Sequence, residues 1–135
     1  MMAALARVVY VVEPDTSVRE GLRRLMQSHG LEARPCDCLK EFLRQAPQAA
    51  GACALLDLSS RELAEPALRG EVRALSTLLP LIALSVRDDA ATRHLARELG
   101  ARAFFRKPVD SAALLDSIDW IMQNEWKPDT PQTRH

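Results

Sequence analysis

The sequence has few sulfur and aromatic residues, and neither charge is in excess. Its 135 residues include three cysteines, and phenylalanine, tryptophan and tyrosine together make up 4%. Lysine plus arginine number 18, and aspartate plus glutamate also number 18. This balance argues against direct nucleic-acid binding by the domain, because such domains usually collect a basic excess on one face.

Long apolar runs are also missing. No run approaches the roughly 18 residues that a membrane-spanning helix needs. The stretch MMAALARVV has too short an apolar part, and no basic leader, for a signal peptide. We therefore expect a cytoplasmic protein without membrane contact. The cysteines at positions 36, 38 and 53 have no spacing typical of a zinc knuckle or disulfide framework, so we interpret them as small, partly buried hydrophobic residues.

Short apolar runs alternate five times with longer amphipathic stretches. The first, third and fourth runs are almost wholly apolar, which indicates a sheet covered on both faces. Alternation of strands and helices predicts parallel strands joined by right-handed crossovers, an α/β fold in one domain. The predicted strands are Val8–Val12, Leu31–Cys36, Cys53–Asp57, Leu81–Ser85 and Ala103–Phe105.

The stretches between the strands follow the helical period. In the first, Val18, Leu22, Leu25 and Met26 fall on one face. The other helices are predicted over Leu39–Ala46, from Pro66 onward, over Asp89–Leu99 with a stop at Gly100, and over Ser111–Gln123.

Polar side chains stand at the carboxyl ends of four predicted strands, where ligands bind in open parallel sheets. Taken singly, each has an ordinary explanation as a helix cap, a turn residue or a solvated loop residue. Together, carboxylates, a hydroxyl and a lysine suit a divalent cation beside a phosphoryl group. In chain order the residues are Glu13, Asp15, Asp57, Ser59, Ser85 and Lys107.

The segments VYVVEPDTSVREGL, ALLDL, LIALS and LGARAFFRKPV, in this order, resemble a response-regulator receiver domain of two-component signalling. The resemblance covers the chain from about Arg7 to Asn124. It implies a flavodoxin-like (βα)5 three-layer sandwich whose five-stranded parallel sheet has the order 2-1-3-4-5. We expect the receiver domain to span residues 1–126. Residues 127–135 are polar and include two prolines, which indicates a polar tail or truncated linker.

The resemblance implies roles for most of the polar residues at the strand ends and for one aromatic residue. Asp57 matches the aspartate that a histidine kinase phosphorylates, and Ser85 and Lys107 match the residues that contact the phosphoryl group. Phe104 matches the aromatic switch residue, although a plain core aromatic would also stand there. The implied Mg²⁺ ligands are Glu13, Asp57 and the backbone carbonyl of Ser59.

Three positions depart from the family pattern. Pro14 stands where the family has a second acid that binds Mg²⁺ directly, and proline offers no side-chain oxygen. Arg61 stands where the family usually has a proline. Val86 stands where the family prefers a small residue, and we expect this branched side chain to narrow access to the phosphoryl pocket. We therefore expect weakened Mg²⁺ binding. Asp15 lies one position too far along and is predicted to cap the next helix, a role for which Ser17 competes.

The resemblance implies a phosphoryl-accepting switch in a histidine kinase to aspartate phosphorelay, with no enzyme activity beyond its own phosphorylation and dephosphorylation. The implied partners are a sensor histidine kinase or phosphotransfer protein and, through the fourth helix, fifth strand and fifth helix, a second copy of the domain. The exposed face of the first helix, with Arg19 and Arg23, is a candidate surface for kinase docking, although an ordinary solvated helix face would carry the same residues. The alternative is a phosphorylation-independent interaction module. We disfavour an aspartyl-phosphate hydrolase, which would have aspartate at position 59, and a flavin-binding module, which needs a glycine- and hydroxyl-rich loop.

Overall fold

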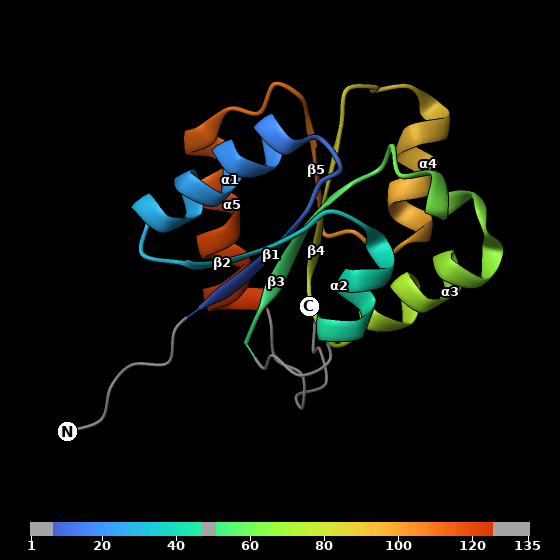
Figure 1. The fold of residues 1–135 in the computed structure, drawn as a ribbon, viewed down its shortest axis with the longest axis horizontal. Helices are drawn as coiled ribbons and strands as arrows, with labels where there is room; N and C mark the ends of the chain where they lie inside the picture. Colours follow the sequence, from blue (N-terminus) through green and yellow to red (C-terminus); the bar gives the residue numbers. More distant parts are fainter. Residues whose placement is uncertain (1–6, 47–50, 126–135) are drawn as a thin grey trace, which may run out of the picture.

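The computed structural model describes residues 7–46 and 51–125 and shows a parallel sheet between two layers of helices (Figure 1). The five strands lie in the order β2-β1-β3-β4-β5, which confirms the predicted fold class and strand order. The strands are β1 (Val8–Val12), β2 (Glu32–Cys36), β3 (Cys53–Asp57), β4 (Leu81–Ser85) and β5 (Ala103–Arg106). The helices are α1 (Thr16–Ser28), α2 (Leu39–Gln45), α3 (Pro66–Leu75), α4 (Ala90–Glu98) and α5 (Ser111–Trp120), with a 3-10 turn η2 (Arg61–Ala64) before α3 and a π-helical turn η3 (Ile121–Glu125) after α5.

Two hydrophobic clusters join the layers, one on each face of the sheet. On one face, Phe42 of α2 packs edge-on against Tyr10 of β1. On the other, Met26 of α1 and Ile118 of α5 pack with Val9 and its neighbours. Every residue of β1, β3 and β4 is buried, as expected of strands covered on both faces. The sheet is thus a rigid platform that fixes where its strand ends lie.

Most predicted boundaries agree with the observed ones to within one residue. β1, β3 and β4 run as predicted, β2 starts one residue later, and β5 extends one residue further. The end of the last helix was predicted wrongly, because α5 gives way to η3 after Trp120. Val18 was predicted to face inward but is 36% exposed, since it lies in the first turn of α1, at the margin of the core. The predicted tail, 127–135, lies outside the described residues.

The local sequence determines where α1 begins and where α4 ends. Asp15 Oδ1 accepts a hydrogen bond from the Val18 amide at 3.0 Å, which confirms Asp15 as the cap of α1. The competing prediction for Ser17 is wrong, because Ser17 already lies inside the helix. Gly100 follows α4 with φ of +84°, as predicted for a glycine in the left-handed conformation that ends a helix. A Cβ added at this glycine would collide with the Ser76 side chain.

Candidate functional site

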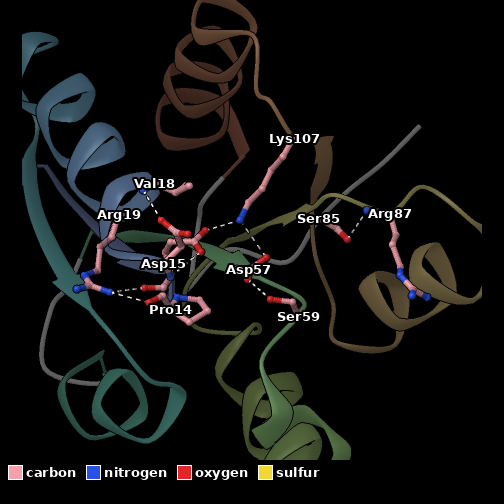
Figure 2. A network of polar contacts seen from close by, with 10 residues as sticks. Pro14, Asp15, Val18, Arg19, Asp57, Ser59, Ser85, Arg87 and Lys107 are labelled. Carbon is pink, nitrogen blue, oxygen red and sulfur yellow. Dashed lines mark hydrogen bonds and ion pairs between the residues drawn. The ribbon is translucent and has the colours of Figure 1, made fainter.

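The predicted site residues lie at one edge of the sheet (Figure 2). Glu13 directly follows β1, Asp57 and Ser85 end β3 and β4, and Lys107 directly follows β5. Because all strands run parallel, their carboxyl ends meet at this edge. The structure brings Glu13, Asp57 and Lys107 into direct contact, whereas the chemical role of each stays a prediction.

Lys107 bridges two buried carboxylates. Its Nζ lies 2.5 Å from Glu13 Oε1 and 3.2 Å from Asp57 Oδ1. The exposed fractions of the side chains are 13% for Lys107, 2% for Glu13 and 3% for Asp57. Moving a carboxylate out of water is costly unless a counter-charge and hydrogen bonds replace the water. Lys107 supplies this counter-charge to both acids, so it is not a solvated loop lysine.

The other oxygen of each carboxylate also meets a donor. Glu13 Oε2 accepts a hydrogen bond from the Asp15 amide at 3.1 Å, and Asp57 Oδ2 accepts one from the Ser59 hydroxyl. In the described parts of the chain, no buried side-chain nitrogen or oxygen lacks a partner. The two acids are therefore held on both sides by the protein.

Arg19 stabilises the turn that carries Glu13. Its guanidinium donates to the backbone carbonyl of Glu13 at 2.7 Å and to that of Pro14 at 3.3 Å. Sequence reasoning placed Arg19 on an exposed helix face, but the side chain is half-buried and turns back toward the end of β1. The signal that could have revealed this contact is the position of an arginine in the first turn of a helix that directly follows the site.

Ser85 and Phe104 lie next to this group of charges without joining it. Ser85 is buried, and its hydroxyl accepts a hydrogen bond from the Arg87 amide at 3.0 Å; within residues 7–46 and 51–125 it makes none to Asp57. Phe104 is half-buried beneath the Arg93 guanidinium, whose carbon lies 4.9 Å from the ring centroid. Contact with the phosphoryl group and the switch role stay predictions for these two residues.

The loop after β3 is anchored to α2, which sequence reasoning missed. Glu62 Oε1 accepts from the Leu39 amide at 2.7 Å, and Oε2 accepts from the Lys40 amide at 3.3 Å. The N-cap residue of α2, Cys38, makes no side-chain cap of its own. Glu62 thus satisfies the free amides at the start of α2 and fixes the loop that contains Ser59.

The residues fit a Mg²⁺ ion poorly. Glu13 and Asp57 are present, but Pro14 has no side-chain oxygen and its carbonyl accepts from Arg19. Every carboxylate oxygen of the two acids already has a protein donor. Over the described ranges, no three histidine, cysteine, aspartate or glutamate side chains group as a metal site. Mg²⁺ requires a near-octahedral set of oxygens, so the pocket would have to rearrange to admit it.

An apolar groove of about 550 Å³ opens beside Lys107, between α1 and the connection from β5 to α5. We call it the α1–α5 groove. Its main apolar lining residues are Val18, Leu22, Leu25, Pro108 and Val109. Among the described residues, no helix is both long and apolar enough to cross a membrane.

Comparisons with known proteins show which family this chain resembles. A family model described as the response regulator receiver domain matches residues 9–119. The response regulator protein TodT of Pseudomonas putida is 29% identical over 117 residues, which cover 87% of this chain and 52% of TodT. The transcriptional regulatory protein TdiR of Thauera aromatica is 31% identical over 114 residues, covering 84% of this chain and 50% of TdiR. This chain thus spans about half the length of these curated relatives.

Solved structures show the same fold. The response regulator StyR is 33% identical with a TM-score of 0.74, covering 88% of this chain and 60% of the StyR chain. FixJ-N, at 19% identity, has a TM-score of 0.78 over 92% of this chain and 99% of its own, and it supports the fold alone. The fold and the strand-end site define a receiver domain of two-component signalling. The chain belongs to the response regulator receiver domain family.

Proposed function

We propose that Asp57 accepts a phosphoryl group from a sensor histidine kinase or phosphotransfer protein, and that the domain is a cytoplasmic phosphorelay switch with weakened Mg²⁺ binding. The observation that supports this most is the Lys107 ammonium, 3.2 Å from Asp57 Oδ1 at the end of β3. A carboxylate nucleophile beside a fixed cation is suited to phosphoryl transfer, which depends on positioning and on neutralising the phosphoryl oxygens.

In the proposed transfer, a carboxylate oxygen of Asp57 attacks the phosphorus of a phosphohistidine. The phosphorus–nitrogen bond breaks, and the imidazole leaves with the bonding electrons and takes up a proton from solvent. Asp57 then carries an acyl phosphate, whose oxygens contact the Lys107 ammonium and the Ser85 hydroxyl. The added negative charge draws Lys107 from its shared position, and the shift of Ser85 and Phe104 changes the face formed by α4, β5 and α5.

Two surfaces are proposed for partners. The α1–α5 groove opens beside Lys107 and so is placed to receive the helix of a kinase or phosphotransfer protein that presents a phosphohistidine. The α4–β5–α5 face is proposed to bind a second copy of the domain. We propose a receiver domain over residues 1–126 with 127–135 as tail or linker, and no direct nucleic-acid contact by this domain, since its charges balance.

One observation favours a second candidate, a phosphorylation-independent interaction module. Lys107 already gives both Glu13 and Asp57 a cationic partner, so the fold needs neither a phosphoryl group nor a metal at this edge. Such a module would bind its partner equally well with or without a chargeable residue at position 57.

The experiment that separates the two candidates uses Asp57→Asn beside the exposed control Asp37→Asn. Amide NMR spectra are recorded before and after addition of a phosphoramidate donor. If the domain is a switch, the donor should shift the amide resonances of residues around Phe104 and Lys107 in the native protein and in Asp37→Asn. The same resonances should stay unchanged in Asp57→Asn. If the donor changes the spectrum of none of the three proteins, and Asp57→Asn binds its partner as the native protein does, the results would support the module instead.

A further inference from the structure

The two buried acids of the pocket share one cation of the chain itself, Lys107. Lys107 Nζ lies within 3.2 Å of one oxygen of each carboxylate. Arg19 Nη1 lies 2.7 Å from the backbone carbonyl of Glu13, at the base of the same turn.

We infer that Lys107 is the resident cation of this pocket, so that Asp57 functions without a bound divalent metal. Lys107 Nζ, Glu13 Oε1 and Asp57 Oδ1 form what we call the Lys107 clamp. In the clamp, Lys107 offsets part of the negative charge of both carboxylates, which is the part that Mg²⁺ takes in a receiver of the usual pattern. This inference rests on the proposed role of Asp57 as phosphoryl acceptor, but the metal binding that it concerns is measured separately.

The turn after β1 also offers few oxygens to a metal ion. Pro14 removes a side-chain oxygen, and its carbonyl is turned toward Arg19, 3.3 Å from the guanidinium. A Mg²⁺ ion that replaced the donors on Glu13 and Asp57 would lie close to the Lys107 ammonium. Like charges repel strongly in a site with little access to water, because solvent screens them only slightly.

Glu13 acts as a positioning residue in this arrangement. Its Oε2 is held at 3.1 Å by the Asp15 amide while Oε1 contacts Lys107, so the carboxylate is fixed at both ends. The glutamate therefore holds the ammonium over Asp57. Its role differs from that of a metal ligand, which the family pattern implies for this position.

The test is a titration with Mg²⁺, followed by the amide NMR shifts of Asp57, Leu58 and Ser59. It compares the native protein with Pro14→Asp, with Lys107→Ala and with Lys40→Ala, an exposed lysine on α2 that serves as the control. We expect no saturable shift in the native protein or in Lys40→Ala at millimolar Mg²⁺. Lys107→Ala and Pro14→Asp are expected to bind Mg²⁺ more tightly, by on the order of tenfold or more.

Thermal unfolding of Lys107→Ala in EDTA and in Mg²⁺ shows whether this variant folds. A melting temperature that is higher in Mg²⁺ than in EDTA supports the inference. If this variant does not fold in either condition, Pro14→Asp decides the result. Saturable Mg²⁺ binding by the native protein with an affinity equal to that of both variants would overturn the inference. If the native protein binds no Mg²⁺ and Asp57 is also never phosphorylated, the proposed function fails while the resident cation stands.

Discussion

Lys107 Nζ lies 2.5 Å from Glu13 Oε1, and this contact joins the loop after β5 to the loop after β1 across two intervening strands. The residues are 94 positions apart in the sequence, so the contact exists only in the folded chain. Both side chains are largely shielded from water. The contact therefore stabilises the sheet edge and at the same time positions the ammonium over Asp57.

Replacing Glu13 tests this positioning. Glu13→Gln removes one of the two negative charges that hold Lys107, and we expect the free energy of unfolding to fall by about 1–3 kcal/mol. The measurement is urea denaturation followed by circular dichroism. Glu20→Gln on the surface of α1, where Glu20 pairs with Arg23, serves as the control and should change stability little. Equal losses in the two variants would contradict a special role for Glu13.

Arg19 and Arg23 offer a matched pair on one helix. Arg19 donates to two backbone carbonyls of the site turn, whereas Arg23 pairs only with Glu20 in its described contacts. We expect Arg19→Ala to lower stability by about 1–2 kcal/mol and to speed amide hydrogen exchange at Asp15. Arg23→Ala should leave that exchange rate unchanged. Faster exchange in both variants would show that the turn does not depend on Arg19.

Two glycines should respond in opposite directions to the same substitution. Gly100 has φ of +84°, and a Cβ there would collide with Ser76, so Gly100→Ala should lower stability by at least about 1–2 kcal/mol. Gly21 lies within α1 with no atom within 4 Å of an added Cβ. Gly21→Ala should raise stability by about 0.5–1 kcal/mol, because alanine favours the helix. Thermal unfolding of both variants shows whether each substitution raises or lowers the melting temperature, and a change in the same direction for both would contradict this expectation.

The cysteines should differ in reactivity. Burial raises the pKa of the Cys36 thiol to about 11 and that of Cys53 to about 12, so near pH 8 both are almost wholly protonated and poorly reactive. Cys38 is partly exposed. A thiol reagent is expected to label Cys38 first in the native protein and the other two after unfolding, as mass spectrometry of digested samples will show. Labelling of Cys36 should accelerate as the pH approaches its pKa, and fast labelling of native Cys53 would disprove the burial.

The sequence predicts the fold well because local pattern and global layering agree. Alternating apolar runs place Val8–Val12 and Leu81–Ser85 at their observed bounds, and the parallel topology then brings Glu13, Asp57 and Lys107 to one edge. Those three residues could therefore be anticipated as neighbours before any coordinates.

The contacts that the sequence did not predict depend on where distant side chains meet. Glu62 caps a helix that begins 23 residues earlier in the chain, and nothing in its own neighbourhood signals that partner. Arg19 has the helical position of a surface residue, and only the three-dimensional course of the turn after β1 brings the carbonyls of Glu13 and Pro14 within its reach. Periodicity identifies the face of a helix, but it does not indicate how a long side chain bends at a helix end.

Intact-protein mass spectrometry shows whether Asp57 accepts a phosphoryl group. The native protein is incubated with a phosphohistidine donor, with and without EDTA, beside Asp57→Asn and the control Asp37→Asn. We expect one phosphoryl group to be added to the native protein and to Asp37→Asn in both conditions, and none to Asp57→Asn. An unmodified native protein, or equal modification of Asp57→Asn, would contradict the proposed role of Asp57.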